Sequence, residues 1–241
     1  MFEQLREGLL DFIFPRNCLC CRRHAPDPKF PPVCDSCLKT VEFNGPPFCL
    51  RCSRRLQNLS AEGICDTCQR HEMAFDCAWA AVAFNNTTRH LIHAFKYQHK
   101  TALRKIFAHL ILDFLNQYKI TLEHYDCLMP IPLHPARLRE RGFNQAQLLA
   151  QQLQKEIKIP LQTHGLVRAH PTLTQTQLSS KERFTNLKGA FRIKHPEDIK
   201  GKNILLIDDL LTTGATASEA ASVLKQHGAG RVGVVTVAIT Q

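Results

Sequence analysis

Apolar positions along most of the chain recur with two periods, one typical of strands and one typical of helices. From residue 77 onward, short apolar runs alternate with segments in which apolar residues return every three or four positions. The predicted strands cover 77–84, 126–129, 203–207 and 231–239. The predicted helices cover 87–97, 102–118, 144–157 and 216–227. This alternation predicts βαβ units and therefore an α/β fold with a mostly parallel sheet flanked by helices.

Two segments depart from this pattern. Beyond a first helix, residues 1–72 are rich in proline and cysteine and have almost no apolar period, so they cannot easily build a core alone. We expect this N-terminal helix and cysteine-rich module to end at residue 72, and an α/β domain to follow at 73–241. The stretch 169–189 is polar and joins two strand-like runs, which is typical of a binding loop or lid; a disordered insertion is the alternative.

Eight of the eleven cysteines form four C-x2-C pairs, arranged as two copies of one spacing. The copies are Cys18, Cys21, Cys34 and Cys37, then Cys49, Cys52, Cys65 and Cys68. Two C-x2-C turns complete a tetrahedral zinc shell. A reducing compartment argues against a disulfide framework, and a redox pair would not need four such turns. The spacing leaves open one or two zinc ions, and consecutive or cross-braced pairs. We expect Cys20 to stay unliganded.

A closed shell of four thiolates has no open coordination position, so the cysteine module is structural or a binding surface. Its arginines, at positions 51, 54, 55 and 70, suit nucleic acid or an acidic protein, and equally a solvated surface.

The chain is basic and has no sign of a membrane segment. Lys and Arg number 31 against 21 Asp and Glu, a net charge of +10 that favours polyanionic partners. The N-terminus mixes charges into its apolar residues and lacks a cleavage site, so we expect no signal peptide. No run approaches the roughly 20 apolar residues of a membrane-spanning helix. The expected location is the cytoplasm.

The segment 204–216, ILLIDDLLTTGAT, combines an apolar strand, two carboxylates and a loop that opens a helix. Ligands of open α/β sheets bind where strands end, which is the predicted place of Asp208 and Asp209. The amides and hydroxyls of the following loop suit a phosphate, and Gly214 allows close backbone approach. Carboxylates next to a phosphate make sense when they accept hydrogen bonds from sugar hydroxyls, as ribose 5-phosphate would offer. An Asp-Asp turn before a threonine N-cap is the alternative.

Residues 204–216 resemble the phosphoribosyl pyrophosphate motif of type I phosphoribosyltransferases, and the wider chain resembles the ComF (ComFC) family of bacterial competence proteins. The second resemblance rests on RGFNQ at 141–145 after PIPLHPARLRE, and on the cysteine pairs. It also rests on residues at family-like spacing, namely Arg168, Thr172, Gln175, Leu178, Arg183, Asn186 and Phe191. The two complete cysteine sets plus Cys20 are a departure, so the family's zinc count is not carried over.

The resemblance implies a set of ligand contacts. Asp208 and Asp209 would hold the ribose 2′ and 3′ hydroxyls. The residues implied around the 5-phosphate are Thr212, Thr213, Gly214, Ala215 and Thr216. Those implied for pyrophosphate are Lys96 and Tyr97, joined by Lys181 and Arg183 from the loop that closes over the site. Magnesium would arrive with the ligand. Lys96 as a solvated helix-end charge is the alternative.

The resemblance also implies binding of single-stranded DNA during natural transformation. Arg137, Arg139, Arg141 and Phe143 would form a basic groove with an aromatic platform; a structural turn, or service to the phosphoribosyl site, is the alternative. Two rival functions are a metabolic phosphoribosyltransferase acting on a base or amine, and a zinc-dependent scaffold that recruits a helicase or a recombination mediator. No residue is compelled to be a general base, so the sequence leaves turnover, acceptor and oligomeric state open.

Overall fold

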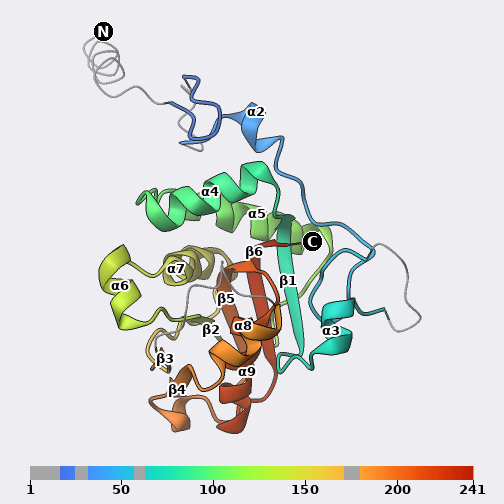
Figure 1. The fold of residues 1–241 in the computed structure, drawn as a ribbon, viewed down its shortest axis with the longest axis vertical. Coiled ribbons are helices and arrows are strands. Elements are labelled where there is room, and N and C mark those ends of the chain that lie inside the picture. Colours follow the sequence, from blue (N-terminus) through green and yellow to red (C-terminus); the bar gives the residue numbers. More distant parts are fainter. Residues whose placement is uncertain (1–16, 25–31, 57–62, 171–179, 241) are drawn as a thin grey trace.

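The centre of the molecule is a four-stranded parallel sheet in the order β1-β6-β5-β2 (Figure 1). The computed structural model describes residues 17–24, 32–56, 63–170 and 180–240. The strands of the sheet are β1 (Cys77–Ala83), β2 (Cys127–Pro130), β5 (Ile204–Leu211) and β6 (Val232–Ile239). A separate antiparallel pair joins β3 (Leu166–Arg168) to β4 (Phe191–Ile193). The predicted α/β fold with a mostly parallel sheet is confirmed.

Helices cover both faces of the sheet, as parallel strands with apolar residues on both sides require. One face packs against α4 (Asn86–Tyr97), α5 (Leu103–Gln117) and α7 (Gln145–Ile157), and Leu205 and Ile207 of β5 belong to this core. The other face packs against α9 (Ala215–Gln226) and α8 (Ser180–Leu187), with Ile204 and Leu206 of β5 in this second core. Successive residues of β5 therefore serve opposite faces of the sheet.

Four elements differ from the sequence-based expectation. Strand β5 runs on to Leu211 rather than ending before the two aspartates, because Asp208 and Leu210 continue the register with β6. Part of the polar stretch 169–189 forms helix α8, held by the fully buried Leu187. Helix α6 (Pro135–Arg141), with proline in its first turn, and the 3₁₀ turn η2 (Pro196–Asp198) were not expected. The expected N-terminal helix and residues 171–179 lie outside the described residues.

The cysteine-rich segment forms two ribbons with the same local structure. We call residues 17–24 and 32–38 the first ribbon, and residues 48–55 and 63–70 the second. Each contains a short helix after its third cysteine, α2 (Asp35–Leu38) or α3 (Asp66–Arg70). Each also has a left-handed residue after its second cysteine, Arg22 with φ 60° or Ser53 with φ 55°. The ribbons are therefore structural repeats.

The chain around the second ribbon covers the exposed edge of β1. The backbone carbonyl of Arg51 accepts from the amide of Ala78 at 2.8 Å, and the Ser53 hydroxyl accepts from the amide of Ala80 at 3.0 Å. Further along, the amide of Ala83 donates to Glu42 at 2.9 Å. Because an uncovered edge strand leaves unpaired amides, this segment completes the sheet.

Candidate functional site: two four-cysteine clusters and an acidic pair before a helix

The eight cysteines gather into two clusters of four. The first cluster joins Cys18 and Cys21 to Cys34 and Cys37, and the second joins the corresponding pairs of the second ribbon, Cys49, Cys52, Cys65 and Cys68. Within each cluster all four sulfurs lie within 4.8 Å of one another. Consecutive C-x2-C pairs therefore share a cluster, which decides between the two pairings that the spacing left open. Cys20 is in neither cluster.

The sulfur geometry fits zinc. One Sγ–Sγ distance is 3.7 Å in the first cluster, between Cys21 and Cys34, and another is 3.6 Å in the second, between Cys52 and Cys65. A tetrahedron with Zn–S bonds of about 2.3 Å has edges of about 3.8 Å, so little adjustment is needed. In both clusters the amide of the third cysteine also donates to the sulfur of the first, at 3.4 and 3.3 Å. Such donors stabilise thiolates. The two clusters are consistent with two zinc sites.

Asp208 and Asp209 lie in the carboxyl-terminal half of β5, where Leu210 and Leu211 continue the strand. Asp208 is half-buried, whereas Asp209 is 1% exposed. The amide of Asp209 donates to Oδ1 of Asp208 at 2.9 Å, so the two side chains belong to one polar cluster in an otherwise apolar strand. A buried carboxylate needs a cation or several donors.

Lys96, at the last turn of α4, is that cation. Its Nζ lies 2.7 Å from Oδ2 of Asp209, with only 20% of the lysine side chain exposed. Burial acts to lower the pKa of Lys96, but the attraction of both carboxylates outweighs it and raises that pKa. Burial acts to raise the pKa of Asp209, and the lysine outweighs it and lowers that pKa. The pair is therefore ionised, and Lys96 is not the solvated helix-end charge of the alternative interpretation.

Asp208 behaves differently from Asp209. Burial and then the negative charge of Asp209 raise the pKa of Asp208 well above its usual range. Two arginines adjoin this cluster. Burial lowers the pKa of Arg168, at the end of β3, and the negative charge of Asp208 opposes this lowering. The positive charge of Arg141 helps to lower the pKa of Asp209. The acidic pair thus lies among cations from α4, α6 and β3, an arrangement suited to a ligand with several negative charges.

The loop after β5 turns sharply into α9. Gly214 has φ 81° and caps the helix, a conformation that favours glycine. The hydroxyl of Thr213 accepts from the amide of Ala215 at 3.4 Å. Thr213 and Ala215 are buried, whereas Thr212 and Thr216 are half-buried and keep part of their surface accessible. Free amides at the start of a helix attract anions.

The four residues expected to contact DNA occupy different environments. Arg139 of α6 is exposed, whereas Arg137 and Arg141 are half-buried. The guanidinium of Arg141 lies 5.1 Å from the ring centroid of Tyr97 and bonds to Gln145, on the side of the acidic pair. Arg141 therefore lies toward the acidic pair, whereas Arg139 faces solvent.

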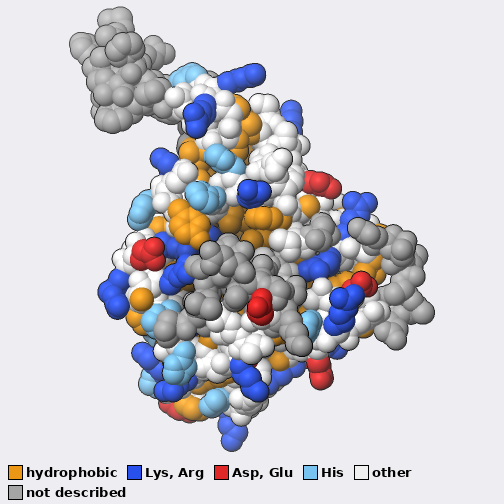
Figure 2. Space-filling view, in the orientation of Figure 1, with side chains coloured by type: hydrophobic (Ala, Val, Ile, Leu, Met, Phe, Trp, Pro, Cys, Tyr) orange, Lys and Arg blue, Asp and Glu red, His pale blue; other side chains and the backbone are white. Residues whose placement is uncertain are grey.

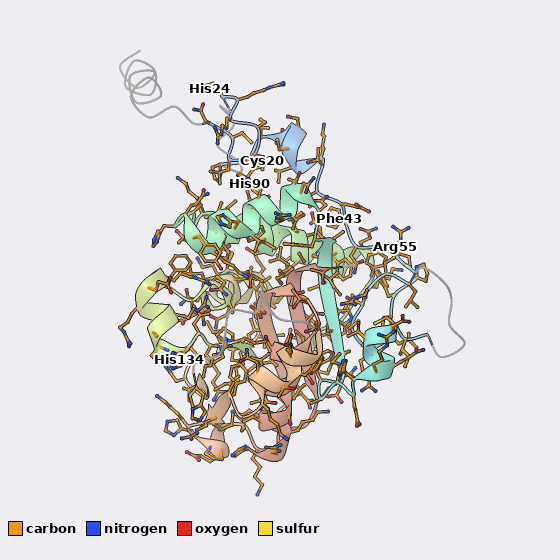
Figure 3. All side chains as sticks on the ribbon, in the orientation of Figure 1. Cys20, His24, Phe43, Arg55, His90 and His134 are labelled. Atoms are coloured by element: carbon orange, nitrogen blue, oxygen red, sulfur yellow. The ribbon has the colours of Figure 1, made fainter. Side chains whose placement is uncertain are left out.

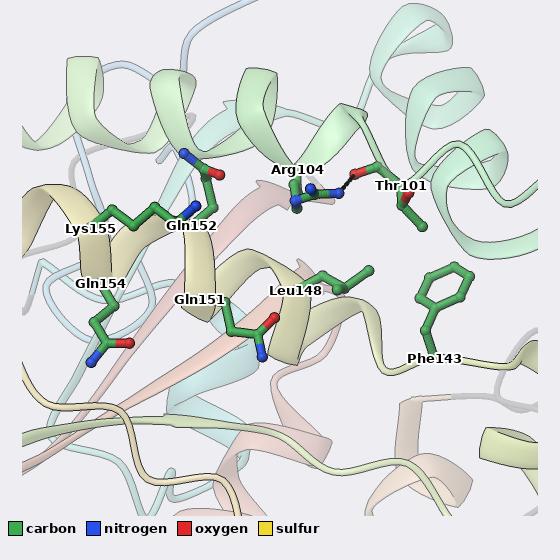
Figure 4. Close-up of a pocket in the computed structure, with 8 residues that line it drawn as sticks. All are labelled: Thr101, Arg104, Phe143, Leu148, Gln151, Gln152, Gln154 and Lys155. Atoms are coloured by element: carbon green, nitrogen blue, oxygen red, sulfur yellow. Dashed lines mark hydrogen bonds between the residues drawn. The ribbon is translucent and has the colours of Figure 1, made fainter.

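Phe143 lines a cavity between α5 and α7. Its ring centroid lies 5.7 Å from that of His99 and 6.2 Å from that of Phe95. The cavity measures about 710 Å³ and is otherwise lined mostly by polar side chains, among them Arg104, Gln151 and Lys155 (Figure 4). Its aromatic and cationic lining suits stacking bases and a phosphate backbone.

The surface in Figure 2 carries more lysine, arginine and histidine than acidic side chains, in line with the net charge. Lys181 and Arg183 belong to α8, but their side chains lie outside the described residues. Sequence reasoning gave Arg168 no role in the site; its only signal was its place at family-like spacing before the polar stretch. Over the four described ranges, no helix is long and apolar enough to span a bilayer.

Two family models match the chain. A model described as phosphoribosyl transferase domain matches residues 138–240, and one described as double zinc ribbon domain matches residues 9–69. Solved structures are more distant. The glutamine phosphoribosylpyrophosphate amidotransferase from B. subtilis is 17% identical, with a TM-score of 0.37 over 56% of this chain and 26% of that one. A similarity at this level has no bearing on function.

Curated relatives match over part of their length. DNA utilization protein YhgH of Escherichia coli (strain K12) is 34% identical over 146 residues, 60% of this chain and 63% of the relative. Competence protein F of Haemophilus influenzae is 34% identical, covering 60% and 64%. Competence protein ComFC of Bacillus subtilis is also 34% identical, covering 60% and 56%. These relatives, together with a phosphoribosyltransferase-type domain behind a double zinc ribbon, confirm the predicted resemblance to the ComF/ComFC family.

Proposed function

We propose that the protein acts in DNA uptake by natural transformation, binding single-stranded DNA in the cytoplasm, and that it holds phosphoribosyl pyrophosphate at the acidic pair. The observation that carries the second part is the grouping of Asp208, Asp209 and Lys96 directly before the loop at 212–216. A diol, a phosphate and a pyrophosphate each find a matching partner there. We also propose a division into 1–72 and 73–241, at the point where the cysteine-rich segment gives way to alternating strands and helices.

Each group has a proposed role. Asp208 and Asp209 accept hydrogen bonds from the ribose 2′ and 3′ hydroxyls, and the amides of the loop with the hydroxyls of Thr212, Thr213 and Thr216 take the 5-phosphate. Lys96 and Tyr97 meet the pyrophosphate, together with Lys181 and Arg183. Magnesium would enter with the ligand and neutralise part of its charge. Arg141 and Arg168 supply further positive charge next to Asp208 and Asp209.

The proposed DNA surface combines Arg137 and Arg139 of α6 with Phe143 at the cavity between α5 and α7. An exposed arginine, a half-buried one and an aromatic ring at the mouth of a polar cavity give backbone contacts and a stacking platform. The names of the relatives, which refer to DNA utilization and competence, support this use. A helicase or recombination mediator is the proposed protein partner.

One experiment tests the ligand. Full-length zinc-loaded protein is titrated with phosphoribosyl pyrophosphate and magnesium in a calorimeter, beside Asp208→Asn plus Asp209→Asn and a control, Asp198→Asn, at an exposed position of η2. We expect the double variant to lose binding by tenfold or more, because lost hydrogen bonds to charged acceptors each weaken binding severalfold or more. The control should bind like the wild type. Equal affinity in all three would remove the phosphoribosyl assignment.

The same preparations test the DNA. A labelled single-stranded oligonucleotide should bind the wild type, with affinity that falls steeply as salt rises. Arg139→Ala should reduce the slope of log affinity against log salt by about 0.7, the value for one phosphate contact. The control Lys194→Ala, at an exposed position directly after β4, should leave the slope unchanged. Absence of DNA binding at low salt would favour one of the two rival functions. Release of pyrophosphate when a base or amine is added would identify a metabolic phosphoribosyltransferase. If the protein neither bound DNA nor released pyrophosphate, the zinc-dependent scaffold would be favoured.

A further inference from the structure

An arginine of the second ribbon reaches the proposed phosphate loop. Arg54 follows Cys52 by two positions, and its Nη2 donates to the backbone carbonyl of Thr212 at 2.6 Å. Its Nη1 donates to the hydroxyl of Thr67 at 2.9 Å, and Thr67 lies between the two cysteines of the next C-x2-C pair. The guanidinium therefore joins the metal-binding turns of the ribbon to the first residue of the loop.

The contact with Thr212 has a consequence for the next amide. In a trans peptide the C=O and the following N–H point in opposite directions. Holding the Thr212 carbonyl toward the ribbon therefore directs the amide of Thr213 away from it. The Thr240 hydroxyl donates to the same carbonyl at 3.4 Å, which further restricts this peptide plane. An amide aimed into the loop is what an anion at the start of α9 would bind.

The segment after the second ribbon packs under the same turn. A Cβ atom at Gly214 would lie 3.4 Å from Sδ of Met73 and 3.6 Å from Phe75. The amide of Ala74 donates to the hydroxyl of Ser218 in the first turn of α9 at 3.0 Å. The four cysteines of the second ribbon belong to the same apolar core as Met73, Phe75 and Ala215. The loop and the ribbon are therefore one packed unit.

We propose that Arg54 is a positioning residue for the phosphate of the ligand, and that the second zinc site acts on ligand affinity through it. This rests on the proposed phosphoribosyl site. Zinc would fix the turns that carry Arg54 and Thr67, and these fix the peptide plane of the loop. The ligand class concerned is a sugar or nucleotide phosphate monoester, because the braced amide of Thr213 would meet the phosphate rather than the base.

The repeat supplies a matched control. Arg23 occupies the place in the first ribbon that Arg54 has in the second, since each carbonyl accepts from the amide of the first cysteine, at 2.8 and 2.7 Å. Arg23 is exposed, whereas Arg54 is half-buried. Replacing either arginine removes the same side chain after the same turn and leaves all eight cysteines in place.

The test measures binding of ribose 5-phosphate to the full-length, zinc-loaded protein by calorimetry. Arg54→Ala should weaken binding about tenfold or more, whereas Arg23→Ala should leave the affinity within twofold of the wild type. Thr67→Val should have an intermediate effect, because Thr67 does not contact the loop itself and only holds Arg54 in place. The zinc content and the thermal unfolding of each variant are measured alongside. Equal affinity for wild type and Arg54→Ala would overturn the proposal.

Hydrogen exchange of the loop keeps the two proposals distinguishable. Peptides covering 210–217 should exchange about tenfold faster in Arg54→Ala than in wild type, and Arg23→Ala should leave them unchanged. If the wild type does not bind ribose 5-phosphate but the exchange changes as expected, the phosphoribosyl proposal fails and the bracing by Arg54 stands. If hydrogen exchange over 210–217 is unchanged in Arg54→Ala, Arg54 does not position the loop, whether or not the protein binds ribose 5-phosphate.

Discussion

The two zinc ribbons share one local structure and differ in how they meet the rest of the protein. In both, the residue after the second cysteine is left-handed and its amide donates to the carbonyl of the first cysteine, at 2.9 Å in each case. His24 and Arg55 occupy equivalent places, yet His24 lies at the outer end of the molecule and Arg55 beside the domain (Figure 3). The local sequence therefore determines the backbone conformation of each ribbon, whereas the contacts that the ribbon makes depend on its position relative to the α/β domain.

The difference is clearest in burial and in partners. No cysteine of the second ribbon is more than 8% exposed, whereas Cys21 of the first is exposed. The first ribbon is followed by Thr40, whose hydroxyl lies 2.9 Å from that of Thr87 at the start of α4. The second ribbon completes the edge of β1 and holds the loop before α9. We conclude that the second ribbon shares an apolar core with the α/β domain, while the first lies against the outside of that domain.

Loss of a zinc ligand should separate the ribbons most strongly. Cys68→Ser opens the second shell, and structural zinc contributes about 10 kcal/mol or more to folding in isolated zinc fingers. This is comparable to the whole free energy of unfolding of an ordinary domain, about 5–15 kcal/mol. We therefore expect Cys68→Ser to lose the cooperative unfolding transition that Trp79 fluorescence reports. Cys37→Ser should lower its midpoint by only a few degrees, because the first ribbon can open alone.

Trp79 suits this measurement because it is the protein's single tryptophan and lies in β1 of the central sheet, opposite Val235 of β6. Zinc content should fall by one equivalent in each variant. If Cys37→Ser abolished the transition as completely as Cys68→Ser, both ribbons would be equally integrated and the contrast would be wrong.

Sequence reasoning reached the ribbons and the sheet but not their connection. The repeated cysteine spacing predicted both clusters, and strict apolar runs such as 204–207 predicted the core strands. The pairing could not be read, because consecutive and alternating pairs share one spacing. Likewise, the contacts of Lys96 with Asp209 and of Arg54 with Thr212 join residues more than a hundred positions apart. Contacts between residues so far apart in the sequence depend on how the whole sheet packs, which cannot be deduced from the residue types alone.

The acidic pair shows the same limit on a smaller scale. Two adjacent aspartates at the end of an apolar strand predicted a polar site, and the structure has that site. Nothing in the sequence distinguishes the two carboxyls, yet the pKa of Asp208 is raised by burial and by its neighbour, and the pKa of Asp209 is lowered by Lys96. Their environments differ because the ammonium of Lys96 lies directly against the carboxylate of Asp209, whereas Asp208 has that carboxylate as its neighbour.

A single hydroxyl should show a smaller effect of the same kind. Ser53→Ala removes the acceptor of the fully buried Ala80 amide, and an unsatisfied buried amide costs about 1–3 kcal/mol. Arg22→Ala is the matched change in the first ribbon, at an exposed position, and should alter stability by less than about 0.5 kcal/mol. Both residues are left-handed, so the backbone cost of alanine is shared. Urea unfolding followed by Trp79 fluorescence gives both values; equal values would mean that the edge contact is not used.

The smallest effect should run in the opposite direction. Leu19 and Leu50 each follow the first cysteine of a ribbon, but Leu19 packs against the core that contains α4 and α5, whereas Leu50 is 76% exposed. Leu19→Ser should therefore cost the first ribbon about 1 kcal/mol, seen as roughly fivefold faster hydrogen exchange over 18–24. Leu50→Ser should leave exchange over 49–55 unchanged. If Leu50→Ser increased exchange more than Leu19→Ser, any residue of the second ribbon would matter for stability regardless of its burial. The opposite result would show that each residue matters through what it touches, which is also why Arg54, and not its counterpart Arg23, is placed to act on the loop.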